Sequence, residues 1–390
     1  MSKWEKVKIG DVSPIVASSV NIPNEKVWLL NLDVVQSNSG AVLEYVFVNQ
    51  KEIGNSTIKF DTENVLYSKL RPYLNKVVMP DQAGYATSEM LPLRPNPRLL
   101  SREYLTHYLR SCVFVSHISE KVAGAKMPRV VTKEFKESLI PLPPLETQKQ
   151  IAKTLDTVSE LLSMRKQQLA ELDGLIKAVF YDMFGDPVRN SLHQKLVKLK
   201  SLIKNKNDLV DGPFGSSVNT KVDYVSDGEI PVIRTKNVSN LEFVTEDLKF
   251  MKREKYETVI RSQVLPNDIV LTKVGTIGNL CIFPEKFSEA VLSTTGSCRI
   301  RVNKEIVDTK FLLYYLHFYK PKMLEIASAG VQAFLNMNHI KEFDIFEIPI
   351  GVQTQFATIV TKIEEQKALV KKAIDETQYN LDSLMSQYFD

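Results

Sequence analysis

Residues 144–187 read PLETQKQIAKTLDTVSELLSMRKQQLAELDGLIKAVFYDMFGDP, and apolar side chains recur in this stretch with alternating spacings of four and three residues. This spacing places the side chains on one seam of an α-helix for about five heptads. A seam of this length predicts a helix that packs against another helix. The predicted packing residues are Ile151, Leu155, Val158, Leu162, Leu169, Leu172, Ile176 and Val179, with Arg165 as a polar break.

The ends of the predicted helix are marked by proline and glycine. Pro143 and Pro144 precede the seam, and proline is tolerated in the first turn of a helix but blocks its backward extension. Gly185 and Pro187 follow the seam, where glycine ends a helix and proline prevents its continuation. The sequence therefore predicts a helix over residues 144–186.

A second copy of this segment lies 205 residues further along the chain. Pro144 corresponds to Pro349, and Gln148 corresponds to Gln353. Such an internal repeat predicts a second long helix over residues 348–390. Its predicted packing residues are Phe356, Val360, Ile363, Val370, Ile374, Leu381 and Leu384, with Lys367 and Thr377 as polar breaks.

The segments outside the helices also repeat, at offsets of 204 to 208 residues. The run from Asn64 to Lys69 matches the run from Asp268 to Lys273, and both alternate like a strand. The predicted domains are therefore a first module at 1–143, a helix at 144–186, a second module at 187–347 and a helix at 348–390. Two similar modules on similar helices pack with approximate two-fold symmetry only if the helices are antiparallel. We expect an α+β fold with two mixed α/β modules and an antiparallel coiled coil.

The charges alternate along the chain. Residues 1–140 carry 18 Lys and Arg against 14 Asp and Glu, and residues 187–346 carry 23 against 18. The helical stretches are acidic, with 5 basic against 7 acidic residues in 141–186 and 4 against 7 in 347–390. A polyanion is therefore attracted to the two modules and not to the helices.

Cysteine, histidine and apolar runs exclude several protein classes. The three cysteines are too few and too scattered for a disulfide framework, and no CxxC pair suggests zinc. No apolar run reaches the roughly 20 residues of a membrane span, and the first residues lack the apolar core of a signal peptide. We expect a cytoplasmic protein with no membrane association and no metal site.

Five motifs together resemble the specificity subunits of type I restriction–modification systems. The helix starts as Pro-Leu-Pro-Pro-Leu-Glu-x-Gln-x-Gln-Ile at 141–151 and stops as Phe-x-x-Met-Phe-Gly-Asp-Pro at 180–187. The second module carries Asp-Gly-Pro-Phe-Gly-Ser at 211–216, Ile-Pro-Val-Ile-Arg at 230–234 and Asp-Ile-Val-Leu-Thr-Lys-Val-Gly-Thr-Ile-Gly at 268–278. The resemblance covers nearly the whole chain. The first module lacks the Gly-Pro-Phe-Gly opening, and the second helix starts without the usual leucine.

The resemblance implies a reader of double-stranded DNA whose two modules each recognise half of an interrupted site. It also implies docking of two adenine-N6 methyltransferase subunits, which use S-adenosylmethionine, and of ATP- and Mg-dependent restriction and translocation subunits. The chain itself would bind no cofactor. Each predicted helix of ~37 residues would span about 55 Å, against ~34 Å for one turn of B-DNA, so the helices would act as a ruler between two reading heads.

The chain lacks the motifs for carrying out this chemistry itself. Adenine methylation needs an Asn/Asp-Pro-Pro-aromatic loop, whereas the nearest match, Pro143-Pro144-Leu145, lacks the polar acceptor and the ring. Asp81, Glu134 and Lys136 fit a nuclease pattern on paper, but Glu134 belongs to the internal repeat. We expect no catalytic residue. A scaffold protein whose modules bind proteins, and a free-standing enzyme with duplicated domains, are the alternatives.

Residues that contact DNA should offer paired hydrogen bonds to base edges or charge to phosphates. The loop at 69–76 and its counterpart at 273–279 follow matching strands and differ in sequence, as two heads with different targets require. A solvated hairpin turn is the alternative at each position. The predicted DNA-contacting residues are Lys69, Arg71, Tyr73, Asn75, Lys76, Lys126, Arg129, Arg234, Lys236, Asn237, Lys273, Thr276, Asn279, Gln332 and Asn336.

Overall fold

The computed structural model describes residues 4–124, 126–328 and 333–390. The chain forms two compact units. Unit 1 consists of Met1–Leu169 and Leu369–Asp390, and unit 2 consists of Ala170–Ala368. Each unit therefore contains one globular module and a part of each long helix, whereas the sequence predicts domain borders at the helix ends.

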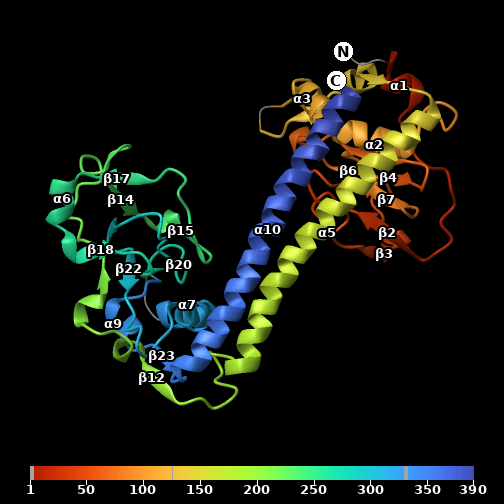
Figure 1. Ribbon diagram of the computed structural model, residues 1–390. Coiled ribbons are helices and arrows are strands. Elements are labelled where there is room, and N and C mark those ends of the chain that lie inside the picture. Colours follow the sequence, from red (N-terminus) through yellow and green to blue (C-terminus); the bar gives the residue numbers. More distant parts are fainter. Residues whose placement is uncertain (1–3, 125, 329–332) are drawn as a thin grey trace. The chain divides into compact units, whose positions relative to one another are not determined.

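Two helices of 40 residues each dominate the fold (Figure 1). They are α5, Leu145–Phe184, and α10, Ile350–Phe389. Both begin directly after a proline, as the sequence predicts. α5 ends at Gly185, whose φ of +84° is a left-handed conformation that glycine adopts without steric cost.

The two helices run antiparallel in each unit. In unit 1, the Arg165 guanidinium donates to the carbonyl oxygen of Ala373 at 2.5 Å and to the hydroxyl of Thr377. In unit 2, Lys367 forms an ion pair with Asp173 further along α5. The later residue of α5, Asp173, thus contacts the earlier residue of α10, Lys367. The prediction of two similar modules and two long antiparallel helices is confirmed.

Burial along both helices follows the heptad spacing. Every residue of the two predicted seams is buried or half-buried, and the polar breaks at Arg165, Lys367 and Thr377 are bonded across the helix pair. The seams do not include Phe180, Phe184 and Phe389, which are fully buried against the modules. The last turn of each helix therefore belongs to a module core as well as to the helix pair.

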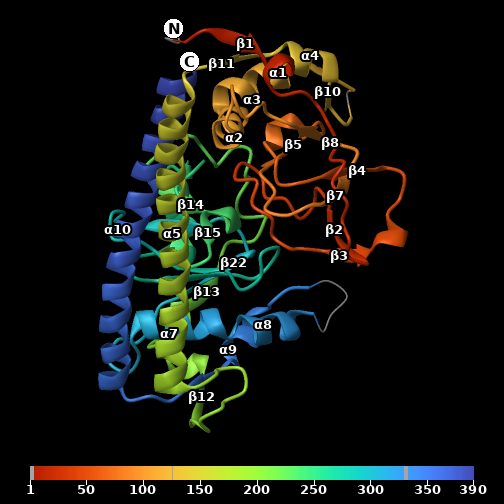
Figure 2. The ribbon, with the colours of Figure 1, turned by 90° about the vertical axis from the view of Figure 1, so that its right-hand side faces the viewer.

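In its described residues, module 1 combines two small sheets with four short helices and a strand pair that joins its two ends (Figure 2). One sheet has the order β3-β2-β7-β4 and the other β6-β5-β8, while β1 pairs with β11 and β9 with β10. The strands and helices are β1 (Lys6–Lys8), α1 (Ile9–Val12), β2 (Lys26–Leu30), β3 (Phe47–Asn49), β4 (Thr57–Phe60), β5 (Val65–Ser68), β6 (Val77–Val78), β7 (Gly84–Thr87), β8 (Met90–Leu93), α2 (Arg102–Arg110), α3 (Cys112–Ser119), β9 (Val122–Ala123), β10 (Arg129–Val130), α4 (Thr132–Glu137) and β11 (Leu139–Pro141).

Module 2 has the sheets β17-β14-β21-β18 and β13-β22-β19-β20, with the strand pairs β12-β23 and β15-β16. Its strands and helices are β12 (Leu196–Lys198), β13 (Leu209–Asp211), β14 (Ile230–Ile233), β15 (Val238–Ser239), β16 (Glu242–Phe243), β17 (Lys249–Met251), α6 (Arg253–Glu257), β18 (Gln263–Val264), β19 (Ile269–Thr272), β20 (Leu280–Ile282), β21 (Ala290–Leu292), β22 (Ser297–Ile300), α7 (Thr309–Phe318), α8 (Lys320–Ala327), α9 (Met337–Lys341) and β23 (Asp344–Phe346).

The two modules share one topology. The order β3-β2-β7-β4 is repeated as β17-β14-β21-β18, and in both sheets the central pair, β2-β7 or β14-β21, is parallel while its neighbours are antiparallel. The order β6-β5-β8 is repeated as β20-β19-β22, to which module 2 adds β13. The sequence repeat is therefore a structural repeat.

A buried glutamine ties the start of each long helix to its module. Gln148 accepts a hydrogen bond from the backbone nitrogen of Ser101 at 2.9 Å and donates to the carbonyl oxygens of Leu99 and Pro143, both at 2.8 Å. The side chain is fully buried. It therefore satisfies three backbone groups that water cannot reach.

Gln353 makes the same three bonds at the start of α10. It accepts from the nitrogen of Asp308 at 2.9 Å and donates to the carbonyl oxygens of Ile306 at 3.1 Å and Ile348 at 2.7 Å. The glutamine that marks both helix starts in the sequence thus fixes how each helix leaves its module.

Each long helix also ends against the module that the other helix leaves. The Phe389 ring at the end of α10 lies 5.5 Å from the rings of both Tyr104 and Tyr108 on α2. The Phe184 ring at the end of α5 lies 4.9 Å from Phe311 on α7, which is the counterpart of Tyr104. Aromatic contacts of this kind bury much apolar area.

Both modules contain an ion pair between an arginine and a buried aspartate, but the aspartate comes from a different position in each module. In module 1, Arg94 pairs with Asp61 at 3.0 Å, and Asn64 accepts from the backbone nitrogen of Asp61. In module 2, Arg301 binds Asp268, which stands at the position of Asn64, with bonds of 2.8 and 2.7 Å. Both arginines join the second sheet to the preceding loop.

None of the helices in the described parts of the chain combines the length and the apolar character that crossing a membrane requires.

We predict that Gln148→Met lowers the free energy of unfolding by about 1–3 kcal/mol, because it leaves three buried backbone groups without partners at nearly unchanged volume. Thermal denaturation of the full chain measures the loss. Gln150→Met, at an exposed position on the same turn, is the control and should unfold like the parent. Equal midpoints for both variants would contradict the role of Gln148.

We predict that Asp61 contributes stability that disappears in acid. Burial alone raises the pKa of Asp61, but hydrogen bonds from Ser18, Arg94 and the backbone of Glu63 outweigh it and hold this pKa below its usual value. A depressed folded-state pKa gives stability that is complete above the unfolded-state value of about 4 and is lost as pH falls further.

The variant Asp61→Asn should therefore be less stable than the parent at neutral pH by about 1–3 kcal/mol, with a smaller difference at pH values below about 3. Denaturation midpoints over a pH series measure this. Asp33→Asn removes an exposed carboxylate of the same module and is the matched control. A difference that stays constant with pH would refute the assignment.

Candidate nucleic-acid interface

Two loops of module 1 that carry predicted DNA-contacting residues lie side by side. The nitrogen of Arg71 donates to the carbonyl oxygen of Pro128 at 2.8 Å, and the nitrogen of Val130 donates to that of Lys69 at 2.9 Å. Residues 69–76 follow β5, and residues 126–130 lead into α4. The structure therefore brings together two segments that are more than 50 positions apart in the sequence.

Four polar side chains of this loop pair are available for a ligand. Arg71, Tyr73 and Lys126 are exposed, Lys69 is half-buried, and no hydrogen bond or ion pair with another described residue occupies any of these side chains. Tyr73 is 55% exposed, which is unusual for an aromatic ring in a folded module.

The backbone presents Arg71 in a strained conformation. Its φ of +49° is left-handed, which costs energy for a residue with a Cβ atom, and Pro72 follows it at the start of a 3-10 turn over Pro72–Leu74. Such strain is typical of residues whose orientation matters for function. The left-handed backbone of Arg71 therefore makes it the strongest candidate of the loop for a functional contact.

The other predicted residues of module 1 are already bonded within the module. Asn75 is 7% exposed and donates to the carbonyl oxygen of Arg110 at 2.9 Å, and Lys76 donates to that of Leu32 at 2.5 Å. Arg129 is exposed and pairs with Glu89 at 3.1 Å. Asn75 and Lys76 thus hold the loop in place, while Arg129 can exchange its partner at little cost because surface ion pairs are weak.

The corresponding loop of module 2 has a buried lysine. The Lys273 side chain is only 6% exposed, and its ammonium lies 3.2 Å from a carboxylate oxygen of Asp211. The nitrogen of Leu335 donates to the carbonyl oxygen of Lys273 at 3.0 Å, so the loop again lies beside the segment that leads into the next helix. The Lys273 ammonium is thus buried and bonded within the module, unlike the exposed side chains of the loop in module 1.

The remaining module 2 predictions divide into exposed and bonded residues. Thr276 is exposed, whereas Asn279 accepts from the Lys320 ammonium at 2.7 Å. Asn336 caps α9 by accepting from the nitrogen of His339 at 2.8 Å. Gln332 lies outside the described residues.

A basic cluster stands where the sequence predicts Arg234, Lys236 and Asn237 to contact DNA. Arg234, Lys236 and Lys249 all pair with Asp247. Hydrogen bonds from Lys236 and Lys249 hold the pKa of Asp247 far below its usual value. One carboxylate therefore faces three cations, which leaves an excess of positive charge at this point.

Asn237 has a different role in the same segment. It is fully buried, accepts from the nitrogen of Arg234 at 3.1 Å and donates to the carbonyl oxygen of Val244 at 3.0 Å. These bonds fix the turn that carries Arg234 and Lys236, so the side chain is not free to contact a base.

Three exposed apolar side chains of module 2 were missed in the sequence. Phe214 is 63% exposed, Val274 48% and Phe334 47%. Phe334 and Val274 are the chain neighbours of Leu335 and Lys273, whose backbones are hydrogen-bonded to each other. A single aromatic residue between glycines, as in Gly-Pro-Phe-Gly, was the available signal for Phe214.

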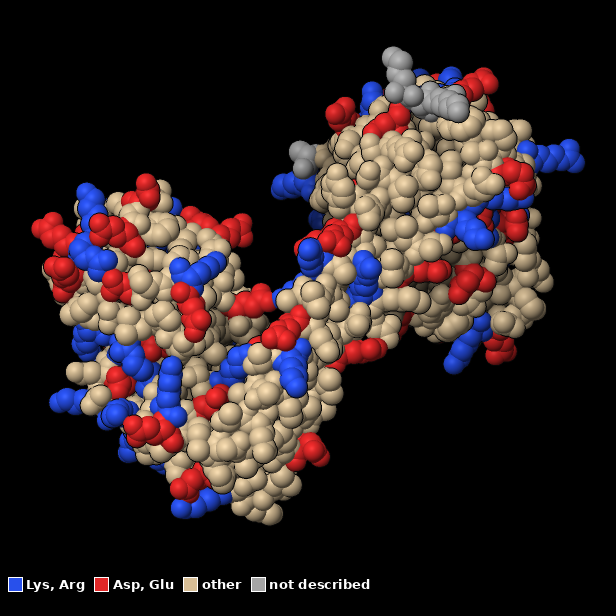
Figure 3. Space-filling view, in the orientation of Figure 1, with Lys and Arg blue, Asp and Glu red and all other residues tan. Residues whose placement is uncertain are grey.

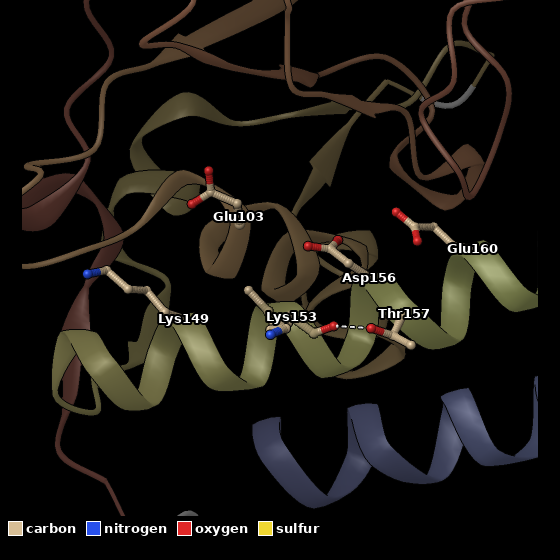
Figure 4. Close-up of a pocket in the computed structure, with 7 residues that line it drawn as sticks. Glu103, Lys149, Lys153, Asp156, Thr157 and Glu160 are labelled. Atoms are coloured by element: carbon tan, nitrogen blue, oxygen red, sulfur yellow. Dashed lines mark hydrogen bonds between the residues drawn. The ribbon is translucent and has the colours of Figure 1, made fainter.

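The start of each long helix forms a shallow groove with one helix of its module, α2 in unit 1 and α7 in unit 2. In unit 1 the groove has a volume of about 400 Å³ and lies between α2 and α5 (Figure 4). Lys149, Lys153, Asp156 and Glu160 of α5 share it with Glu103 of α2. Its surface is therefore strongly charged, with both signs present.

Unit 2 has a groove of about 630 Å³ at the equivalent place. Lys310 stands at the position of Glu103 and pairs with Glu364 at 2.6 Å, and Thr354 and Thr358 replace the two lysines. The two grooves share their location and differ in their charges. On the face drawn in Figure 3, acidic and basic side chains are likewise intermixed on each module.

Thiol and metal chemistry have little basis in the described residues. Burial raises the pKa of both Cys281 and Cys298 to about 12, which keeps these thiols protonated. No group of three or more His, Cys, Asp or Glu side chains in the described ranges is arranged to hold a metal ion.

Comparison with known proteins identifies relatives for both halves of the chain. A family model described as the type I restriction modification DNA specificity domain matches residues 1–173 and 198–378. The chain is 26% identical to the putative type I restriction enzyme MjaX specificity subunit of Methanocaldococcus jannaschii, over 74% of this chain and 64% of that protein. It is 22% identical to the MjaVIII specificity subunit of the same organism, over 95% and 86% of the two chains.

Solved structures show the same fold. The S subunit of the type I restriction-modification system from M. genitalium is 14% identical, with a TM-score of 0.60 over 100% of this chain and 96% of that one. A chain from a type I R-M system studied for complex assembly and conformational transition is 18% identical, with a TM-score of 0.61 over 99% and 97%.

The chain spans 64% of the length of the first two curated relatives that it matches. The family model nevertheless covers most of both modules and of both long helices. The chain therefore belongs to the family of type I restriction–modification DNA specificity proteins.

Proposed function

We propose that the chain reads an interrupted DNA sequence, with module 1 recognising one half of the site and module 2 the other. The observation that carries this proposal is the pair of adjacent loops in module 1. Lys69, Arg71, Tyr73 and Lys126 all come from these loops, and none is bonded to another described side chain. Basic and aromatic side chains of this kind suit phosphates and base edges.

In module 2 the proposed surface is less basic and more apolar. Thr276 and the basic cluster of Arg234 and Lys236 would contact DNA, together with Phe214 and Phe334. Apolar side chains contact the thymine methyl group or wedge between base steps. Two heads with such different loops would recognise different half-sites.

We also propose that the chain acts through partners in the cytoplasm and is not itself catalytic. Two adenine-N6 methyltransferase subunits using S-adenosylmethionine would dock on it, and restriction subunits using ATP and Mg would join them. The two equivalent grooves beside α2 and α7 support two similar docking places. Met164 and its counterpart Leu369, 65% and 69% exposed on the helices, would be covered by these partners.

The experiment that tests this function is coexpression of the chain with its methyltransferase partner in a host that lacks adenine methylation. Sequencing then maps the modified adenines. Two short defined blocks separated by an unspecified spacer are expected. A single continuous motif, or no chain-dependent methylation, would contradict the proposal.

The helices are proposed to set the spacer length. Deletion of facing heptads, residues 166–172 and 368–374, shortens each helix by about 10 Å while it keeps the seam in phase. We predict that the spacer between the two methylated blocks becomes about three base pairs shorter, since B-DNA rises about 3.4 Å per base pair. The same methylation mapping measures the change, and an unchanged spacer would refute the ruler.

We predict that Arg71→Ala weakens duplex binding by about 1–3 kcal/mol, or roughly 5- to 150-fold in Kd. Fluorescence anisotropy with a labelled duplex that contains the mapped site measures this at fixed salt. Lys51→Ala removes an exposed charge from another loop of module 1 and is the control. If Arg71 contacts a base, the loss should be larger for the mapped site than for random sequence. Parent-like affinity would remove Arg71 from the interface.

A further inference from the structure

Unit 1 contains a polar cavity that lies outside the two candidate DNA-reading loops except for Asn75. It has a volume of about 890 Å³ and is bordered by residues 36–39, by the junction of α2 and α3, and by facing parts of α5 and α10. Figure 1 shows α2 and α3 beside these parts of the two long helices. Most of its lining is hydroxyl, amide or charged, and its apolar part consists of Val115, Leu162, Leu381 and Met385.

Arg110 lines this cavity and forms no ion pair with a described residue. One terminal nitrogen of its guanidinium donates to the carbonyl oxygen of Val77 at 2.6 Å, and its buried Nε has no partner among the described residues. The nearest acid to act on it, Asp156, is bonded to His107 at 2.7 Å. Burial lowers the pKa of Arg110 to about 10. A largely buried cation of this kind is costly unless an anion accompanies it.

Other groups of the cavity also suit an oxyanion. Lys166 on α5 is exposed, and its ammonium has no described partner. Ser159 and Ser163 of α5 also line the cavity, whereas the buried Ser111 hydroxyl already donates to the carbonyl oxygen of Tyr108 at 2.7 Å. Asp382, the carboxylate among the lining residues, accepts from the Gln378 amide at 3.0 Å. Arg110, Lys166 and the hydroxyls of Ser159 and Ser163 therefore line the space together with one acid, Asp382.

Unit 2 shows that the fold does not require this cavity. At the positions of Arg110 and Ser111 it has His317 and Phe318, and at the position of Met385 it has Phe180. The Phe180 and Phe318 rings lie 5.0 Å apart, and Phe318 also contacts Tyr314. Aromatic packing thus occupies in unit 2 the place that small and polar side chains leave open in unit 1.

The cavity adjoins the candidate DNA-reading loop. Asn75 follows the 3-10 turn over Pro72–Leu74 that begins after Arg71, and it is one of the lining residues of the cavity. The nitrogen of Asn38 at the cavity donates to the carbonyl oxygens of Leu74 and Asn75 at 3.2 and 3.1 Å. A ligand in the cavity is therefore next to the loop that would contact the duplex.

We propose that this cavity binds a phosphate group through Arg110 and Lys166, and that its source is a backbone phosphate of the bound duplex. The choice of source rests on the proposed function, whereas the phosphate chemistry does not. The site would anchor the DNA backbone beside the reading loop of module 1, with no counterpart in module 2.

Cys112 provides a direct readout, because it is the exposed cysteine of the chain and lines the cavity, while Cys281 and Cys298 are buried. The rate of Cys112 alkylation by iodoacetamide in the full chain is followed by mass spectrometry. It is measured with inorganic phosphate, with a duplex several turns long, and with chloride at equal ionic strength. Duplex binding is recorded in the same samples by anisotropy.

Phosphate and duplex should both slow alkylation, and chloride should not. Lys166→Gln should weaken the phosphate effect about five- to tenfold, because one charged hydrogen bond is lost. Asp382→Asn should strengthen it, since the repelling carboxylate is removed. Ser159→Glu, which places in the cavity the acid that unit 2 has at Glu364, should abolish it. Lys372→Gln, at an exposed position of α10, is the matched control.

Absence of protection by phosphate, or an equal loss in Lys166→Gln and Lys372→Gln, would overturn the phosphate site. Protection by phosphate but not by a duplex that binds would leave a site for free phosphate and overturn the DNA source. A chain that binds no duplex would contradict the proposed function, and the phosphate measurements would still decide the cavity.

Discussion

The pairing of the first turns of one long helix with the last turns of the other organises both compact units. Gln148 and Gln353 bond each helix start to its own module, and Phe389 and Phe184 place each helix end against α2 or α7 of the opposite module. Each module core is thus completed by residues from two distant parts of the sequence. Because the polar contacts of Arg165 and Lys367 lie within the seam, the helix pair has one favoured register.

Much of this arrangement was predictable because it depends on periodicity and repetition. The heptad spacing identifies both helices, and the prolines and Gly185 mark their limits. The repeat at about 205 residues predicts that the modules share a topology, and the strand orders agree. Antiparallel pairing followed from the repeat alone. These features are local or repeated, so a single sequence contains them.

The candidate site was less predictable, because the role of a polar residue depends on partners that are remote in sequence. Lys273 follows a strand as Lys69 does, yet its side chain is buried and pairs with Asp211, which is remote in the sequence. Asn237 has the composition of a base reader but serves to fix a turn. The division of each long helix between two compact units was not predictable for a related reason. A heptad pattern shows that a helix packs, but not which half of it packs with which module.

Unit 2 is a continuous stretch of chain, whereas unit 1 joins residues 1–169 to residues 369–390. During synthesis, the ribosome therefore delivers every part of unit 2 before it delivers the segment that covers Tyr104 and Tyr108. The half of the protein that is translated first is the last to become complete. Until then its uncovered aromatic surface is exposed to the cell, where it is a target for chaperones and for aggregation.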